Sequence, residues 1–170
     1  MSKRWYALRV KPHKEKSVYE RLEEANIEGY LPTVQVQPTN PRAAKIKPYF
    51  PGYLFVYTDL DETGINKLRW LRGTIGLVEF GGIPAVVPPN LISDLQQLMK
   101  QIKKEGGLAK FEFKHGDSVR IVEGPFEGYE AMFDMHLPGA DRAQVLLAFL
   151  SQAPQPLHLD TAAIKKIDKK

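Results

Sequence analysis

FPGYLFVY, residues 50–57, is the stretch of the sequence that decides the fold. In an extended chain successive side chains point to opposite faces, so its aliphatic side chains face one way and its aromatic rings face the other. A strand that is apolar on both faces either lies in the middle of a layered domain or exposes one apolar face. Few short helices are available here to cover a sheet, so we expect an exposed aromatic face formed by Tyr53, Phe55 and Tyr57. The residues alone are also consistent with the alternative that these rings belong to the core.

The segments around this strand predict a domain of mixed helix and sheet. Residues rich in aromatic and branched side chains indicate strands, and apolar residues three or four positions apart indicate helices. In chain order we expect a strand at 5–10, a helix over 14–26, an extended segment at 29–37, the strand at 50–57, a helix over 63–72, two short extended segments within 75–87, and a last helix that begins after Pro88-Pro89 with Asn90 as its N-cap.

The pattern changes after residue 105. Two glycines follow the last helix, and the residues beyond them alternate short extended runs with tight turns, as in the turn-rich EGPFEG at 123–128. Short strands joined by tight turns are typical of a small barrel. We therefore divide the chain into a first domain over residues 1–105, a linker over 106–114 and a second domain over 115–170.

The composition excludes several classes of protein. The chain has 170 residues and no cysteine, which rules out disulfides, thiolate nucleophiles and Cys-based zinc sites. No apolar run approaches the roughly 18 residues that a bilayer span needs. There is no phosphate-binding glycine loop and no GxSxG motif, and the four histidines lie far apart. We expect a cytoplasmic protein that is not an enzyme and carries no metal or cofactor.

The positive charge is concentrated in the first part of the chain. Up to Ala109, sixteen lysines and arginines stand against eleven acidic residues, whereas from Lys110 onward eight stand against nine. This balance favours a polyanionic partner for the first domain, although a solvated charged surface is the alternative for any single cation.

Two motifs, in this order and at this spacing, give the chain a resemblance to the NusG family. The first is Trp5-Tyr6 followed by FPGYLFV at 50–56, and the second is GDSVRIVEGPFEG at 116–128, which looks like a KOW motif. The resemblance covers nearly the whole chain. It implies an α+β fold in which a four-stranded antiparallel sheet is flanked by helices and is followed by a small KOW β-barrel.

The second domain carries a local conflict between helix and strand. Ala131 stands where the KOW motif usually has glycine, and alanine favours helix over glycine by about 1 kcal/mol. The run at 142–150 is apolar on both faces as a strand, yet as a helix it places apolar residues four positions apart on one side. Pro154 and Pro156 would end a long second helix. We expect the barrel, with a helical hairpin as the alternative.

The resemblance also implies partners and sites. The family's first domain binds the clamp helices of the largest subunit of RNA polymerase, and its polymerase-binding patch falls at Phe50, Pro51, Tyr53, Phe55 and Phe80. The side of this domain that faces upstream DNA and the non-template strand corresponds to Lys11, Lys14, Arg21 and Arg72. Arg42, in the basic loop before the aromatic strand, is a further candidate for contact with nucleic acid.

The function that the resemblance implies is transcription elongation and antitermination. Such a factor binds RNA polymerase and suppresses its pausing or termination, and we expect it to be a monomer. Ala131 and the apolar run after it are similar to the specialised RfaH-like branch, which acts at particular operons. The alternatives are a housekeeping member that also recruits the termination factor Rho, and a ribosome-associated KOW protein that binds RNA. Rho or a small-subunit ribosomal protein is the expected partner of the second domain.

Overall fold

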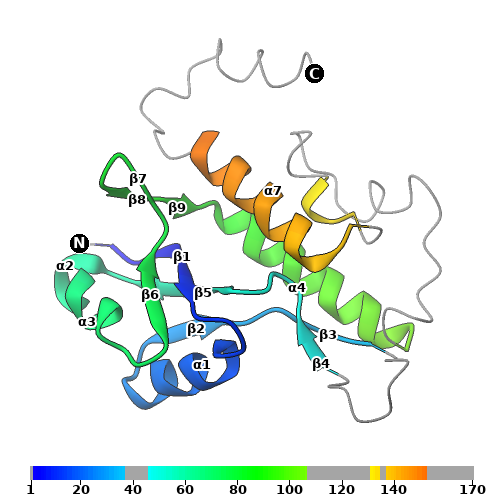
Figure 1. Cartoon of the computed structure of the whole chain (residues 1–170), viewed down its shortest axis with the longest axis horizontal. Coiled ribbons are helices and arrows are strands. Elements are labelled where there is room, and N and C mark those ends of the chain that lie inside the picture. The colour runs from blue at the N-terminus through cyan, green and yellow to red at the C-terminus, as the bar shows by residue number, and fades with distance from the viewer. Residues whose placement is uncertain (1, 37–45, 107–130, 135–136, 153–170) are drawn as a thin grey trace.

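One antiparallel sheet forms the centre of the protein in its computed structural model, which describes residues 2–36, 46–106, 131–134 and 137–152 (Figure 1). Its main path runs in the order β2-β5-β1-β6, and a fifth short strand, β9, pairs with the start of β1. The four-stranded antiparallel sheet that was expected is therefore confirmed. The strands are β1 (Arg4–Val10), β2 (Glu28–Tyr30), β5 (Tyr53–Thr58), β6 (Thr74–Leu77) and β9 (Val86–Val87).

The pairing of β1 with β5 sets the two faces of the sheet. Ala7 lies opposite Phe55, and Leu8 lies opposite Leu54. Because side chains alternate along each strand, Ala7 and Phe55 belong to one apolar cluster while Leu8 and Leu54 belong to the other. Both faces of the sheet are thus covered, and the aromatic strand lies in the middle of three layers.

Three helices cover the face that carries Leu8 and Leu54. They are α1 (Glu15–Glu24), α2 (Leu60–Thr63) and α3 (Ile65–Arg69). Val18 and Leu22, four residues apart on α1, are fully buried against this face. The helix is shorter than the 14–26 expected, since the chain turns back at Asn26 with a positive φ of 60°.

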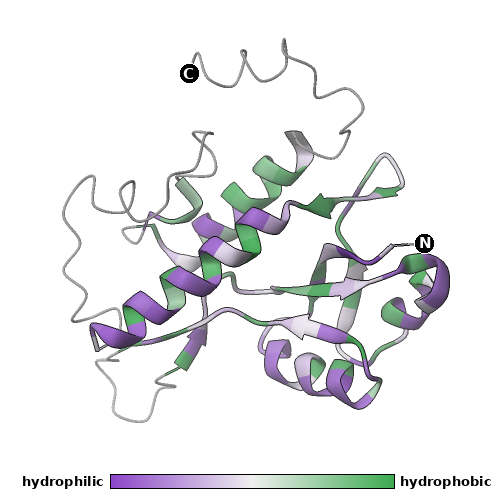
Figure 2. Cartoon of the chain, turned by 180° about the vertical axis from the view of Figure 1, so that it is seen from behind, coloured by the Kyte–Doolittle hydropathy of each residue, from purple (hydrophilic) through white to green (hydrophobic). Residues whose placement is uncertain are grey.

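The long helix α4 (Pro89–Lys104) packs on the other face. Hydrophobic residues recur along it at helical spacing, and Figure 2 shows the resulting alternation of green and purple bands. The N-cap is Pro88 and Pro89 occupies the first helical position, so the expectation of Asn90 as N-cap was wrong by two residues. Proline suits that position because the first N–H of a helix has no partner within the helix. The buried residues of α4 are Leu91, Ile92, Leu95, Leu98 and Ile102.

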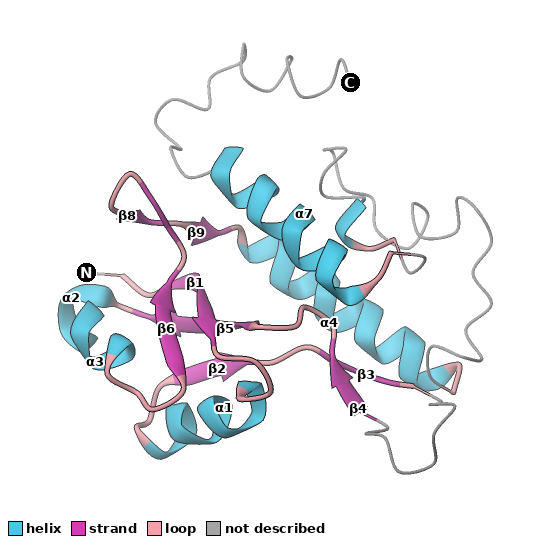
Figure 3. Cartoon of the chain, in the orientation of Figure 1, coloured by secondary structure: helices cyan, strands magenta, loops and turns pink. Residues whose placement is uncertain are grey.

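The segment at 142–150 is helical, as the helical-hairpin alternative predicted. It belongs to α7 (Gly139–Gln152), which lies beside α4 in Figures 1 and 3, and residues 131–132 are helical as well. The expected barrel would place a strand at 142–150, and for this segment that expectation was wrong. As a helix the run gathers Leu146, Phe149 and Leu150 on one buried side, which a strand apolar on both faces could not do. The KOW motif at 116–128 and Pro154 and Pro156 lie outside the described residues.

Two small hairpins complete the described fold. β3 (Thr33–Gln35) pairs with β4 (Ile46–Pro48), and β7 (Glu79–Phe80) pairs with β8 (Ile83–Pro84). The class is α+β with antiparallel sheets, as expected. Among the residues the structure describes, no helix is long and apolar enough to cross a membrane.

Candidate functional site

The five residues predicted to bind polymerase lie on one face of the sheet, but they are not equally accessible. Phe50 and Phe55 are 0% exposed, Tyr53 and Phe80 are half-buried, and Pro51 is exposed. The aromatic face that was expected to be open is therefore closed at its centre. We call Phe50, Tyr53, Phe55 and Phe80 the aromatic face from here on.

The rings at the centre of this face are held edge to face. Phe50 meets Phe55 with ring centroids 6.1 Å apart and an interplanar angle of 87°, and Tyr49 meets Phe50 at 4.8 Å and 80°. Edge-to-face contacts place the positive edge of one ring against the negative face of the next. Tyr30 stacks on the other side of Phe55 at 6.4 Å. The face is a rigid, interlocked surface.

The C-terminal helix covers the aromatic face. Buried residues of α7 and of the helical turn before it share one apolar cluster with Phe50 and Phe55, and Tyr53 and Phe80 pack against that cluster. The covering residues come from a part of the sequence more than seventy positions beyond the aromatic strand. They are Met132, Phe133, Ala143, Leu146, Phe149 and Leu150.

Arg142 fastens α7 to the segment that leads into the aromatic strand. Its Nε donates a hydrogen bond to the Tyr49 carbonyl (3.2 Å), one terminal N–H donates to the Leu137 carbonyl (2.6 Å), and its guanidinium lies 4.2 Å from the centre of the Tyr49 ring. Burial lowers the pKa of Arg142, while Tyr49 and then Asp134 act in the opposite direction. The side chain is only 5% exposed, so these contacts replace the water that the cation has lost.

Two further contacts join the same parts of the chain. The Tyr49 hydroxyl donates to the Met132 carbonyl at 2.9 Å, and burial raises the pKa of that hydroxyl. Gly139, the first residue of α7, lies so close to the Pro51 ring that an added Cβ would stand 3.0 Å from it. Sequence reasoning did not single out Tyr49, Arg142 or Gly139. A lone arginine at the start of an apolar run is the signal that could have drawn attention to Arg142.

Three of the five residues predicted to contact nucleic acid come together at one corner of the sheet. Lys11, Lys14 and Arg72 are exposed, and the two loops that carry them are joined, since the Lys11 N–H donates to the Gly73 carbonyl at 2.8 Å. Other exposed cations of the same two segments extend the patch. The basic corner, as we use the term, consists of Lys11, Lys14, Lys67, Arg69 and Arg72.

The other two predicted nucleic-acid residues differ. Arg21, on α1, is half-buried, and its Nε is shielded from solvent without a hydrogen-bond partner. The Nε of Arg21 is therefore poorly placed to meet a phosphate. Arg42 lies outside the described residues.

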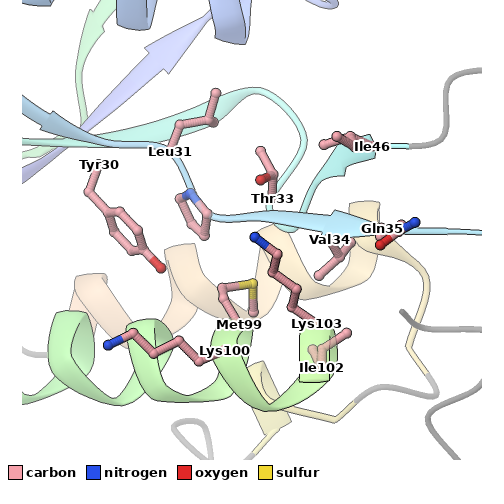
Figure 4. A pocket seen from close by; sticks show the side chains of 11 residues that line it. Tyr30, Leu31, Thr33, Val34, Gln35, Ile46, Met99, Lys100, Ile102 and Lys103 are labelled. Carbon is pink, nitrogen blue, oxygen red and sulfur yellow. The ribbon is translucent and has the colours of Figure 1, made fainter. Parts of the chain in front are cut away.

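A groove of about 280 Å³ lies between the β3 hairpin and the end of α4 (Figure 4). Its walls are largely apolar, with two lysines at one side, and none of the predicted site residues lines it. Within the described residues, no group of three histidines or acidic residues could hold a metal ion. The lining residues are Tyr30, Leu31, Pro32, Thr33, Val34, Gln35, Ile46, Met99, Lys100, Ile102 and Lys103.

The protein thus combines an antiparallel α+β fold with an aromatic face and a cationic corner. Comparison with known proteins makes the class specific. Residues 3–96 match the family model described as transcription termination factor nusG. That match spans more than half of the chain, and the chain belongs to the NusG family of transcription factors.

Relatives in other bacteria resemble the chain along nearly its whole length. The transcription termination/antitermination protein NusG of Thermus thermophilus is 27% identical over 184 residues, covering 98% of this chain and 100% of the relative. The protein of the same description from Deinococcus radiodurans is 26% identical over 192 residues, with the same coverage. A solved structure titled "Domain interaction in Thermotoga maritima NusG" covers 59% of each chain with 23% identity and a TM-score of 0.42.

Proposed function

We propose that this protein is a transcription elongation and antitermination factor that binds RNA polymerase through the aromatic face. The observation that carries the proposal is the face itself. Four aromatic residues that belong to or pack against one apolar cluster lie within the region that matches the family model, and relatives along the whole chain are described as termination/antitermination proteins. Clustered aromatic rings supply much of the energy of protein interfaces.

The occupant of the face in this structure supports a helical partner. α7 is an amphipathic segment of fourteen residues that buries one side on the aromatic face. A surface that accepts one helix by packing side chains into its hollows is suited to another. The clamp helices of the largest polymerase subunit, which the family resemblance implies as partner, have that form.

It follows that α7 and the polymerase compete for one surface. Phe50 and Phe55 are 0% exposed and share one apolar cluster with residues of α4 and α7, so departure of α7 would open part of this cluster to a partner. The apparent affinity for polymerase is then reduced by the fraction of molecules in which the face is covered. A signal that displaces α7 would raise that affinity without changing a single contact at the interface.

Among the functions considered, we favour a specialised, operon-directed factor. Helical structure at Ala131 and in α7, where the housekeeping pattern would have barrel strands, supports this choice. Recruitment of Rho or of a small-subunit ribosomal protein would belong to the domain at 115–170, most of which lies outside the described residues. A ribosome-associated RNA-binding role would leave the aromatic face without a use.

We further propose that the basic corner contacts nucleic acid next to the bound polymerase, either upstream DNA or the non-template strand. Lys11, Lys14 and Arg72 are exposed and lie on joined loops, which suits them to follow a phosphate backbone. Arg21 and Arg42 stay predictions for the same role.

A pull-down with purified core RNA polymerase tests the proposal. The Leu146→Asp variant places a carboxylate on the buried side of α7 and should release the helix, whereas Gln144→Asp adds the same charge on its exposed side. We expect more polymerase bound by Leu146→Asp than by wild type, and no change for Gln144→Asp.

The same assay locates the site. In the Leu146→Asp background, Tyr53→Ala and Phe80→Ala should each reduce the captured polymerase about tenfold or more, as truncation of a central interface ring does. Ile46→Ala, at an exposed position on β4 outside the aromatic face, is the control. Equal capture by all folded variants would rule out the aromatic face as the polymerase site.

A further inference from the structure

Trp70 is the most exposed large hydrophobic side chain in the described part of the protein. It caps the C-terminal end of α3, and 80% of its surface is open to solvent, compared with 49% to 64% for the three isoleucines that are also exposed. Exposing an indole to water forgoes a large hydrophobic gain, which often marks a binding surface. Nothing in the proposed polymerase site uses Trp70.

The charge around Trp70 is mainly positive. Residues 11–14 and 65–75 together contain all five cations of the basic corner and no acidic residue. Acidic residues of neighbouring elements lie close by, among them Asp61 and Glu62 on α2, which contacts α3. Glu79 pairs with Arg69 at 3.9 Å, and Glu15 is buried and accepts a hydrogen bond from the Gly52 N–H at 2.7 Å. The indole thus stands within a cationic surface, beside Arg69 and Arg72.

The turn that carries Trp70 is held in place before any partner arrives. The Thr74 hydroxyl lies 2.8 to 3.0 Å from the carbonyls of Leu68, Arg69 and Leu71, and the Gly73 carbonyl accepts from the Lys11 N–H. Gly73 has a φ of 96°, and an added Cβ would stand 3.0 Å from Val18. A fixed turn presents the ring at little entropic cost, as a recognition platform requires.

We propose that Trp70 is a stacking platform for an unpaired base of single-stranded nucleic acid, with Arg69, Arg72 and the rest of the basic corner neutralising the flanking phosphates. The inference deepens the nucleic-acid part of the proposed function and rests on it. An indole offers a flat face to a base, and stacking of that kind needs bases that are not already stacked in a duplex. Single strands are therefore preferred over double-stranded DNA, and sequence preference is weak.

The tryptophans of the chain provide the probe. There are two, Trp5 and Trp70, and Trp5 packs on Tyr57 with centroids 5.1 Å apart. Trp5→Phe keeps a ring in that contact and leaves Trp70 as the sole indole. At low salt, we expect a single-stranded oligonucleotide to quench the remaining emission, a duplex of equal charge to quench it less, and an abasic strand of equal length to leave it nearly unchanged. Deoxy and ribo strands run in parallel distinguish DNA from RNA.

Binding measured by anisotropy of a labelled oligonucleotide distinguishes stacking on Trp70 from nucleic-acid binding by the basic corner as a whole. Trp70→Ala should bind the single strand roughly five- to a hundredfold more weakly, Trp70→Phe should lose much less, and neither change should alter binding of the abasic strand. Arg72→Gln should weaken both ligands and flatten the salt dependence. Ile83→Ala controls for loss of an exposed apolar side chain.

Three results would contradict the role proposed for Trp70, each in a different way. If Arg72→Gln weakens binding while Trp70→Ala does not, the basic corner binds nucleic acid but Trp70 is no platform. If wild type binds no strand at low salt, the nucleic-acid part of the proposed function fails with it. If polyglutamate quenches Trp70 as strongly as the oligonucleotide does, the patch recognises acidic protein instead.

Discussion

At the scale of the residue, Arg142 shows how a single side chain can set the balance between two states of a protein. Its guanidinium has left water and depends on the Tyr49 and Leu137 carbonyls and on the Tyr49 ring for compensation. The Tyr49 carbonyl and ring lie on the first domain, whereas Leu137 belongs to the segment that leads into α7. When α7 leaves, the cation regains water, so it contributes to specificity of docking more than to the stability of the sheet.

Replacing Arg142 should therefore loosen α7 selectively. We expect Arg142→Met to weaken docking by about 1.5–3 kcal/mol, the usual contribution of hydrogen bonds to a charged group, while the sheet stays folded. Hydrogen exchange of residues 139–152 against residues 53–58 measures the difference. Gln144→Met, at an exposed position of the same helix, is the control and should exchange like wild type. An equal change in the exchange rates of both segments would contradict a local role for Arg142.

Glu15 makes a second contact that belongs to this scale. It is buried at the start of α1 and accepts a hydrogen bond from the Gly52 N–H at 2.7 Å, which fixes the turn before the aromatic strand. Glu15→Ala leaves that N–H without a partner and should lower the free energy of unfolding by about 1–3 kcal/mol. Glu15→Gln keeps an acceptor and should lose less. Urea denaturation checks the order, and a loss for Gln as large as for Ala would show that the charge matters more than the hydrogen bond.

At the scale of the element, α7 is the segment whose local sequence does not determine its structure. The run at 142–150 is apolar enough for a buried strand and is also spaced for a helix. Packing against the aromatic face settles the matter here, because only the helix puts Leu146, Phe149 and Leu150 on one side. Tertiary contacts of this kind commonly override local preference.

The fit of the first turn of α7 provides a test at this scale. An added Cβ at Gly139 would stand 3.0 and 3.1 Å from two atoms of the Pro51 ring, which cannot rotate out of the way. Gly139→Val should therefore displace the start of α7, speed hydrogen exchange across 139–152 and raise capture of core polymerase. Ala140→Val makes a comparable change at an exposed position one residue on. Unchanged exchange in Gly139→Val would mean that the contact is not needed for docking.

Other elements show what the sequence could and could not predict. β1, β5, α1 and α4 were expected because each has enough residues to show a period of two or of 3.6. β3, β7 and β8 fall within the extended segments expected at 29–37 and 75–87, but their bounds and their pairing with β4 and with each other were not predicted, because the strands have only three or two residues. β4 falls at the end of a stretch read as a loop. Pairing over short distances is set by the turn and by neighbours, not by periodicity.

At the scale of the whole molecule, the family resemblance predicted which residues would gather, and the fold explains why they do. Phe50, Tyr53, Phe55 and Phe80 meet because β5 lies in the middle of the sheet and Phe80, on β7, packs against the same apolar cluster. Lys11 and Arg72 meet because β1 and β6 are neighbours.

The sequence did not predict that the C-terminal helix α7 packs with the aromatic face of the first domain. Arg142, Gly139 and the buried face of α7 act on residues of the first domain that lie far away in sequence, and no local pattern reports such a contact. The exposed indole of Trp70 escaped for a similar reason, since a tryptophan after a helix is as easily buried as open until its neighbours are in place. Long-range packing sets the accessibility of both candidate sites.

The proposal that α7 and RNA polymerase use the same face has a direct test. Hydrogen exchange of the full chain, alone and in excess core polymerase, tests it most directly. We predict that binding slows exchange around residues 50–56 and 79–83 and speeds exchange across 139–152, because the polymerase replaces α7 on the rings. A complex in which residues 139–152 stay as protected as in the free chain would contradict the claim and place the polymerase on another surface.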